Sequence, residues 1–434
     1  MRNILHTDIS HLEASAMGNG RRTHGLCRSE LGVFIGRTRV GGLRRSENEP
    51  TLFRPDPCAQ KDLVVSLAWS NTQTEIVSPH GSLHPVFDQH LPEGMLRRHL
   101  RDAFLSSFKN MDDLEMLRFV GSSLIGRLRF SESADALLPA PSINLRADIL
   151  DASEEELLGR MLERFAPFSG VSGVQSKFLV RDEDAARGCP LAGTTHIVKT
   201  FDPATFPGLA FNEWVCFQAA GKAGLPIPVV EVSADGRWLA VERFDLVNSG
   251  DDSRYIAFED MCSLSGNTSA AKYHGAYEQI ASVIQDFSCE PSEDLSRFFS
   301  MVALSCALRN GDAHRKNFGM LYEGRDDVRL APAFDVICTE VYPELESKMA
   351  LSMDGMEAWP DAKRLERFGI KHCRLEPQEV GELVSRVCEA AVESLSFLSD
   401  ERMPQATAKA MRQAVEFAVA SLRGITISRT HQRP

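Results

Sequence analysis

The sequence predicts an α+β protein in which a small β-rich unit precedes a unit of mixed strands and helices and a mostly helical C-terminal part. Three observations predict this fold class. Short runs of β-branched and aromatic residues alternate with turn residues up to about residue 130. Amphipathic patterns with a helical period dominate after residue 260. A polar, glycine-containing loop at residues 310–318 follows a hydrophobic helix, and such a density of polar groups is unsuited to a core.

Composition narrows the class of protein. A chain of 434 residues is long enough for two or three domains, and 43% hydrophobic and 25% charged residues are ordinary for a globular protein. The net charge of −12 argues against a broad nucleic-acid-binding surface. Ten cysteines without a CxxC pair indicate neither a zinc site nor a disulfide framework. No apolar run is long enough for a membrane span and no signal peptide is evident, so we expect a cytoplasmic protein without a membrane partner.

The first 150 residues are predicted to form a polar tail (residues 1–29) and a β-rich N-terminal subdomain (residues 30–150). Turn residues separate the apolar runs there, which favours a small antiparallel unit. Expected strands cover residues 31–36, 39–44, 51–54, 63–68 and 123–130, and expected helices cover residues 95–109 and 112–119. The stretch at residues 131–142 is rich in serine and proline, as is typical of a linker.

A second unit is predicted at residues 151–260. Ser153 and Glu156 have the spacing of a capping box at the start of a helix. A glycine-rich turn follows and enters a strand. The expected elements are a helix at residues 153–165, a strand that ends at residue 180, strands at 195–201 and 238–245, and a helix at 209–223.

The remaining residues, 261–434, are predicted to be mostly helical. Residues 261–277 are rich in small polar residues, so we expect a mobile segment that faces a substrate. Helices are expected at residues 277–287, 291–308, 377–398 and 407–422.

The polar loop carries the strongest chemical signal. Four residues separate Asp312 from Asn317, and a second aspartate, Asp335, follows eighteen residues after Asn317. Protein kinases use this spacing for a catalytic aspartate and a Mg²⁺-binding asparagine, with the other metal ligand on a later segment. Carboxylate and amide oxygens suit a hard cation such as Mg²⁺. The alternative at this point is an N-capping aspartate in a solvated loop.

Weaker signals lie upstream of this loop. Lys199 lies on an apolar strand, where its charge requires an anionic partner; a nucleotide phosphate is one reading and a lysine that extends from a sheet edge is the other. Glu213, on the following helix, is a candidate partner for Lys199. The glycine-rich residues 169–177 would let backbone N–H groups approach phosphates, although a plain β-turn is the favoured interpretation of this segment alone.

Taken together, these segments resemble the HipA family of toxin serine/threonine kinases over residues 31–422. Six ordered segments in the two larger units and one in the first unit carry the resemblance. They are Gly173, Val174, Gln175 and Lys177 in the glycine-rich segment; residues 195–199; Asn212 with Glu213; residues 239–245; residues 310–318; residues 334–337; and residues 91–96 of the first unit.

The resemblance implies a bilobal protein-kinase-like fold that binds ATP and Mg²⁺. It implies that Asp312 is the catalytic base, that Lys316 neutralises charge on the transferring phosphoryl group, and that Asn317 and Asp335 are the metal ligands. The implied nucleotide contacts are Lys199 at the phosphates, Glu242 and Phe244 at the adenine hinge, and Ser172, Gly173, Val174, Gln175, Lys177 and His314.

The resemblance also implies silencing by autophosphorylation of a serine in the glycine-rich loop. The family's acceptor position is occupied here by Gly170. Ser172 is then the natural acceptor, and Ser169 is a second one. A phosphate there would add about −2 charge beside the ATP phosphates and repel the loop.

The partners implied are a HipB-like helix-turn-helix antitoxin and a protein substrate in translation, such as glutamyl-tRNA synthetase or another aminoacyl-tRNA synthetase. Operator DNA would be contacted mainly through the antitoxin, in agreement with the net charge of −12. Two alternatives from other classes remain: a catalytically silent corepressor that binds the antitoxin, and a small-molecule kinase with the same fold.

Overall fold

The computed structural model describes residues 30–424, apart from residues 46–49, 58–62, 71–72, 79–81, 105–111, 153–155, 172–174, 187–192, 248–252 and 346. The predicted tail at residues 1–29, the capping serine Ser153, and Ser172, Gly173 and Val174 of the glycine-rich turn therefore lie outside the described residues.

A five-stranded antiparallel sheet with the order β4-β3-β2-β1-β5 forms the first unit. Its strands are β1 (Leu31–Ile35), β2 (Thr38–Arg44), β3 (Leu52–Pro55), β4 (Ile76–Val77) and β5 (Leu128–Ser131), and its helices are α2 (Pro85–Asp88), α3 (Gly94–Phe104) and α4 (Asp113–Val120). Aromatic rings fill its core: Phe53 stacks on Trp69, and Phe87 contacts both Phe53 and Phe130. The β-rich prediction for this unit matches the sheet.

The strand predicted at residues 63–68 is wrong. These residues are irregular, and they face the buried carboxylate of Glu259 instead of a neighbouring strand. Glu259 accepts hydrogen bonds from Ser66 Oγ at 2.7 Å and from the N–H of Leu67 at 2.9 Å. A side chain from a distant part of the chain therefore replaces the strand partner that the apolar pattern alone predicted.

A second five-stranded sheet, ordered β6-β7-β8-β10-β9, forms the middle of the molecule. Its strands are β6 (Ser142–Ile143), β7 (Ser176–Asp182), β8 (His196–Thr200), β9 (Val230–Val232) and β10 (Trp238–Glu242). The sheet begins before residue 151, the predicted start of the second unit, because β6 pairs in parallel with β7. Helix α5 (Leu157–Phe165), helix α6 (Leu209–Lys222) and the short hairpin of β11 (Leu246–Val247) and β12 (Arg254–Tyr255) accompany it.

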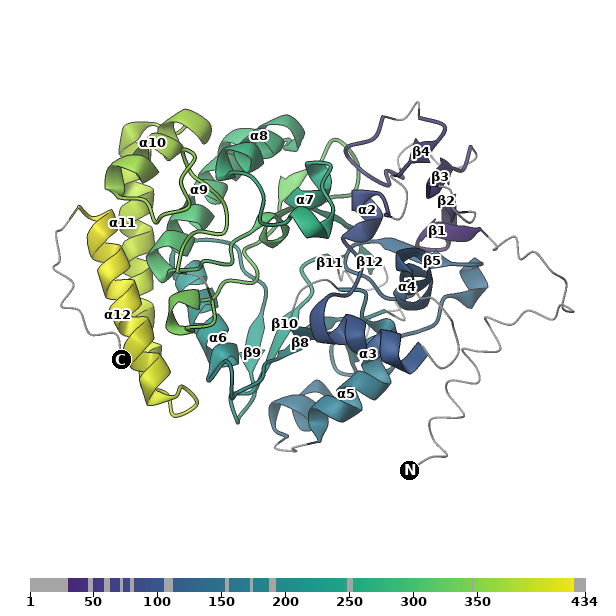
Figure 1. Ribbon diagram of the computed structural model, residues 1–434, viewed down its shortest axis with the longest axis horizontal. Coiled ribbons are helices and arrows are strands. Elements are labelled where there is room, and N and C mark those ends of the chain that lie inside the picture. The colour runs from purple at the N-terminus through teal and green to yellow at the C-terminus, as the bar shows by residue number, and fades with distance from the viewer. Residues whose placement is uncertain are drawn as a thin grey trace, which may run out of the picture.

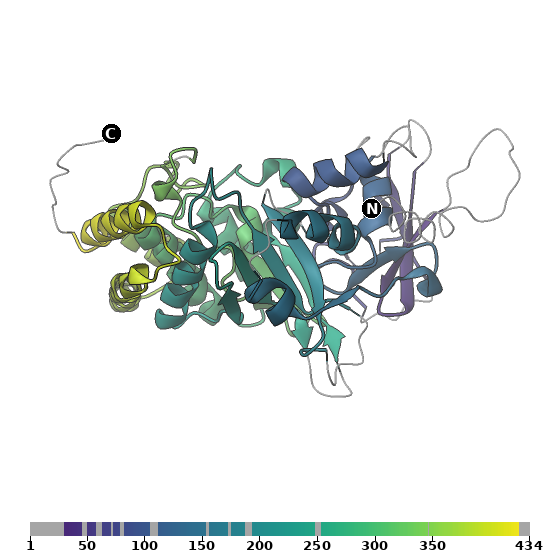
Figure 2. The same cartoon turned by 90° about the horizontal axis from the view of Figure 1, so that it is seen from below.

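The two faces of this second sheet pack against different parts of the protein. Alternate residues of a strand point to opposite faces. Leu239 and Val241 of β10 pack with Phe217 of α6, whereas Trp238 and Ala240 join the core of the first unit. The sheet is thus covered by α6 on one face and by the first unit on the other. Figure 2 shows the first unit at one end of the long axis and α11 and α12 at the other.

The C-terminal part is helical, as predicted, with a small sheet of β13 (Ala257–Asp260), β14 (Gly319–Tyr322) and β15 (Arg329–Leu330). Its helices are α7 (Met261–Leu264), α8 (Tyr277–Phe287), α9 (Pro291–Leu308), α10 (Ala362–His372), α11 (Pro377–Ser394) and α12 (Gln405–Leu422). Helix α9 is buried among α8, α11 and α12 (Figure 1). Helix α10 was absent from the sequence prediction. Among the helices that the structure describes, none is long and apolar enough to cross a membrane.

Buried histidines make the stability of the fold dependent on pH. Burial, helped by the guanidinium of Arg129, lowers the pKa of His90 from 6.5 to about 3. The unfolded chain therefore binds a proton at this site in a pH range where the folded protein does not. Stability from this group is complete above pH 6.5 and is lost as the pH falls toward 3.

We expect His90→Gln to weaken the dependence of the melting temperature on pH between 6.5 and 4, because the glutamine cannot take up a proton. The measurement is thermal unfolding of the wild type and the variant across this range. His99→Gln, on the partly exposed surface of α3, is the control. Parallel curves for wild type and His90→Gln would show that this histidine does not cause acid sensitivity.

Candidate active site

Helix α9 delivers the polar loop at residues 310–318. The helix ends at Arg309, which has a left-handed backbone with φ of 57°. Asn310 Oδ1 then accepts the N–H of Asp312 at 3.1 Å, and Gly311 donates its N–H to Thr339 Oγ1 at 2.7 Å. These bonds fix the backbone on both sides of Gly311, so that the position of Asp312 is determined by the loop.

Asp312 has a tyrosine as its neighbour. The hydroxyl of Tyr273 donates a hydrogen bond to Asp312 Oδ1 at 2.6 Å, and the Tyr273 ring lies edge-on to His314 with centroids 4.9 Å apart. An acceptor hydroxyl would have to make this same bond to use Asp312 as a base. Tyr273 was not singled out from the sequence; it lies in the segment 261–277 that was expected to face a substrate.

His314 is neutral in this arrangement. Burial lowers the pKa of His314 to about 4. Its Nδ1 atom is buried and has no hydrogen-bond partner among the described residues. The ring therefore offers a polar atom toward the site without adding a positive charge at neutral pH.

Asp335 lies opposite the loop, and two lysines surround it. Lys177 Nζ is 2.6 Å from Asp335 Oδ2, and Lys199 Nζ forms an ion pair with Asp335 Oδ1. Burial alone would raise the pKa of Asp335, but the two ammonium groups outweigh it and hold this pKa well below its usual range. Asp335 has a φ of 52°, in the left-handed region, which aspartate tolerates better than most residues.

Lys199 is also paired with Glu213, as predicted. The Lys199 Nζ to Glu213 Oε1 distance is 2.5 Å, and the two side chains are only 4% and 1% exposed. Burial opposes the charge of Lys199, yet the carboxylates of Asp335 and Glu213 raise its pKa. One ammonium thus joins β8 of the sheet, α6, and the segment that carries Asp335.

Asn317 has the properties of a metal ligand. Its Nδ2 donates to the backbone oxygen of Asp335 at 3.4 Å, which holds the two residues together. Its Oδ1 atom is buried and has no hydrogen-bond partner among the described residues. A buried acceptor without a partner is costly, and a hard cation would satisfy it. Asn317 Oδ1 and the Asp335 carboxylate therefore fit Mg²⁺.

The ammonium of Lys316 contacts Glu93 Oε1 at 3.0 Å and Ser269 Oγ at 2.7 Å, and its side chain is 5% exposed. The role predicted for Lys316, to neutralise charge on a transferring phosphoryl group, stays a prediction. Glu93 was noted within residues 91–96 but was given no role. Nothing in its local pattern shows that it reaches this loop.

The predicted hinge residues, Glu242 and Phe244, lie at and just after the end of β10. Glu242 is exposed, and its N–H donates to the Val229 oxygen at 2.9 Å. The ring of Phe244 packs 5.4 Å from that of Phe334, which directly precedes Asp335. The structure thus connects Phe244 to the site through Phe334, and the adenine contact of Glu242 and Phe244 remains a prediction.

The glycine-rich segment is described only in part. Ser169 is fully buried, and its hydroxyl donates to the Phe165 oxygen at 2.7 Å and accepts the N–H of Leu179 at 2.9 Å. This hydroxyl holds β7 in place, which argues against Ser169 as an acceptor of phosphate. Gln175 is half-buried at the start of β7, and Ser172, Gly173 and Val174 lie outside the described residues.

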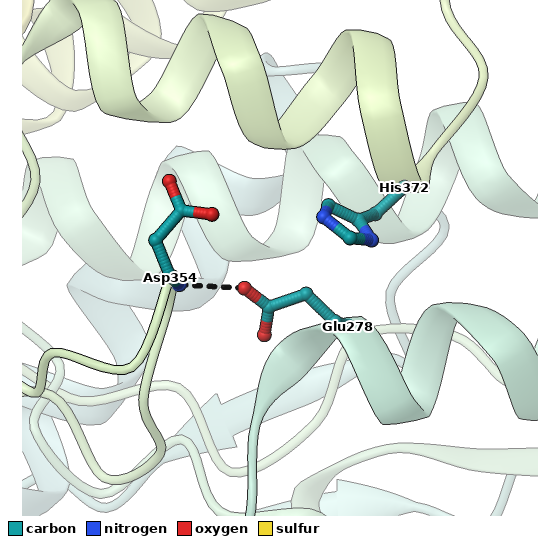
Figure 3. A group of neighbouring side chains, drawn as sticks. All are labelled: Glu278, Asp354 and His372. Atoms are coloured by element: carbon teal, nitrogen blue, oxygen red, sulfur yellow. Dashed lines mark hydrogen bonds between the residues drawn. The ribbon is translucent and has the colours of Figure 1, made fainter.

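A separate group of potential metal ligands consists of Glu278, Asp354 and His372 (Figure 3). The N–H of Asp354 donates to Glu278 Oε1 at 2.6 Å, and the Asp354 carboxylate forms an ion pair with Arg367 at 2.7 Å. Because the guanidinium already compensates Asp354, we assign this group a structural role, in which it ties the loop at Asp354 to α8 and α10.

Family models match most of the chain. The model described as HipA-like C-terminal domain matches residues 169–395, and the one described as HipA N-terminal domain matches residues 31–131. A crystal structure of the Shewanella oneidensis MR-1 toxin–antitoxin system HipA, HipB and its operator DNA complex aligns with a TM-score of 0.69 at 19% identity. That alignment covers 92% of this chain and 100% of the other, and it shows a shared fold.

Two curated relatives from Sinorhizobium fredii are named putative kinases. Y4mE is 30% identical over 248 residues, which cover 53% of this chain and 58% of the relative. Y4dM is 28% identical over 289 residues, which cover 62% of this chain and 65% of the relative. The chain thus spans less than two thirds of the length of either relative.

We expect Lys199→Met to destabilise the protein by about 3–5 kcal/mol, because it leaves the buried carboxylate of Glu213 without its ammonium. Chemical denaturation measures the change. The control is Lys222→Met. Lys222 Nζ lies 3.1 Å from Glu393 Oε2, and the two side chains are 39% and 64% exposed, so this variant removes an ion pair at the surface. Equal losses in the free energy of unfolding for the two variants would show that the buried Lys199–Glu213 pair contributes no more to stability than an exposed pair.

Proposed function

The chain belongs to the HipA family, and from this premise we propose that it is an ATP-dependent protein serine/threonine kinase that acts as the toxin of a toxin–antitoxin pair. One observation carries the proposal: a single buried lysine, Lys199, contacts both Glu213 on α6 and Asp335. A strand lysine paired with a helix glutamate, near a metal-binding aspartate, is the arrangement that kinases require for phosphoryl transfer.

Asp312 acts as the base in this proposal. It accepts the proton of the acceptor hydroxyl while that oxygen bonds to the γ-phosphorus and the bond to the leaving ADP breaks. The Tyr273 hydroxyl occupies Asp312 Oδ1, so an acceptor hydroxyl would bind at Oδ2 or displace the tyrosine. His314, neutral and buried beside Asp312, lines the same region.

Asn317 and Asp335 would hold Mg²⁺. Bound there, the ion would neutralise charge on the phosphates. Lys199 and Lys177 lie on adjacent strands and pair with Asp335, so they offer positive charge to phosphate oxygens at the same place. The glycine-rich turn that precedes Lys177 would supply backbone N–H groups, and Glu242 and Phe244 would bind the adenine.

The protein substrate is proposed to be a component of translation, such as glutamyl-tRNA synthetase or another aminoacyl-tRNA synthetase. A HipB-like antitoxin is the proposed partner, and operator DNA would be reached mainly through it. The net charge of −12 supports this indirect contact, since the chain itself would be repelled by DNA. Membership of the HipA family supports these assignments.

We expect Asp312→Ala to lower phosphoryl transfer by about 10²–10⁴-fold, the range of general-base catalysis, while ATP binding persists. The measurement is transfer of label from γ-labelled ATP in the presence of Mg²⁺ to the protein itself and to cell-extract proteins. Thermal shift with ATP reports binding. Asp326→Asn, an exposed aspartate of the same lobe, is the control.

Near-normal transfer by Asp312→Ala would refute the assigned base. If the wild type bound ATP and labelled no protein, the proposal of a protein kinase would fail. Label on small molecules would then indicate a small-molecule kinase, and the absence of any label would indicate a silent corepressor.

We expect autophosphorylation at Ser172 and none at Ser169, because both hydrogen-bonding roles of the Ser169 hydroxyl are already used in the core. Mass spectrometry of the wild type, Ser172→Ala and Ser169→Ala after incubation with ATP measures this directly. Loss of phosphate only in Ser172→Ala agrees with the proposal. Phosphate on Ser169 would show that β7 opens far enough to release it.

A further inference from the structure

The first unit reaches the polar loop through one carboxylate. Glu93 follows α2, and its two oxygens contact two lysines of the helical part: Oε1 lies 3.0 Å from Lys316 Nζ and Oε2 lies 2.8 Å from Lys272 Nζ. The side chains of Glu93, Lys272 and Lys316 are 19%, 10% and 5% exposed. Charge pairs that are this well shielded from solvent interact more strongly than surface pairs.

Both lysines are next to groups that the proposed reaction uses. Lys316 directly precedes the metal ligand Asn317. Lys272 directly precedes Tyr273, whose hydroxyl binds Asp312. The Lys272 oxygen also accepts the N–H of Arg315 at 3.2 Å. One carboxylate therefore ties together the loop that carries the base and the segment that covers it.

The residues before Glu93 are fixed by burial and by hydrogen bonds to the helical part. His90 and Leu91, just before it, are buried, and Gln89 Oε1 accepts the N–H of Asp260 at 3.0 Å. Asp88, which directly precedes Gln89, accepts the N–H of Ser269 at 2.5 Å and so adds a second contact with the helical part. Figure 1 shows α2 beside α7, in agreement with their packing. The position of Glu93 is thus fixed by the contact between the first unit and the helical part.

The same segment also contacts the second sheet. Met95, two residues after Glu93 at the start of α3, has its sulfur 3.3 Å from Ser176 Oγ, and Ser176 precedes Lys177 on β7. Residues 88–95 therefore span from the polar loop to the strand that follows the glycine-rich turn. A segment in this place can set the relative position of the groups on both sides.

We propose that Glu93 is a positioning residue of the active site, contributed by the first unit, which fixes the polar loop through Lys316 and the Tyr273 segment through Lys272. The inference rests on the proposed function for its catalytic readout. Without the carboxylate, two ammonium groups would face each other in a poorly solvated space, and their repulsion would displace both segments. The first unit would then be required for catalysis and not only for binding partners.

The test compares Glu93→Gln, which keeps the shape and removes the charge, with Glu75→Gln as the control. Glu75 belongs to the same unit and pairs with Arg54 at 2.7 Å on the surface. We expect Glu93→Gln to lower kcat roughly 10–100-fold while the KM for ATP stays unchanged, because misplaced groups slow the chemical step. Glu75→Gln should change neither constant.

A rescue variant separates positioning from general damage to the fold. In Glu93→Gln/Lys272→Met, one of the two repelling ammonium groups is gone, so kcat should recover in part. A merely structural role would predict further loss in the double variant. The proposal is overturned if Glu93→Gln keeps its kcat, or if its loss is not recovered in the double variant.

Hydrogen exchange distinguishes failure of this inference from failure of the proposed function. In Glu93→Gln, amides of residues 269–273 and 311–317 should exchange faster than in the wild type, whether or not the protein transfers phosphate. Faster exchange in a protein without kinase activity would support the coupling and refute only the function. Unchanged exchange in both segments would refute the coupling itself.

Discussion

A buried ammonium is stable only where carboxylates surround it, and the described part of the chain meets this demand for Lys199 with residues from two distant segments. Glu213 comes from α6 and Asp335 from the loop that follows β15. Removing such a charge from water costs several kcal/mol, which the two partners must offset. The pairs therefore specify how the sheet, α6 and the helical part are placed. These pairs also place several charged side chains where the phosphates of a nucleotide would bind.

The first unit is integrated with this arrangement. Arg243, just after β10, donates to the Leu124 oxygen at 2.8 Å, and Asp245 accepts the N–H of Gly126 at 2.5 Å. Strands β7, β8 and β10 contribute buried side chains to the same core as the first unit and α5. Such contacts make the first unit a structural neighbour of the predicted hinge, and they give Glu93 a fixed base from which to reach the polar loop.

The sequence predicted what depends on local pattern. The helices at residues 277–287 and 291–308 have the predicted limits, and the proline at the first position of the second helix is a typical start signal. The pairing of Lys199 with Glu213 was predicted from their order along the chain alone, by analogy with the strand lysine and helix glutamate of kinases, and the structure contains this pair.

What depends on tertiary contacts was missed. Helix α10 buries two large apolar side chains, Leu365 and Phe368, within a stretch of mostly charged residues. The stretch at residues 63–68 has the composition of a strand, but Glu259 determines its conformation. Glu93 and Tyr273 have ordinary surroundings in the sequence, and only the folded chain brings them to Lys316 and Asp312.

We propose that Lys199, Asn317 and Asp335 form a site for a metal-bound nucleotide. A crystal structure with a non-hydrolysable ATP analogue and Mn²⁺, in which anomalous scattering locates the metal, would test this site. We expect Mn²⁺ to be bound by Asn317 Oδ1 and the Asp335 carboxylate, with phosphate oxygens on Lys199. Metal or nucleotide bound without these three groups would refute the proposed site.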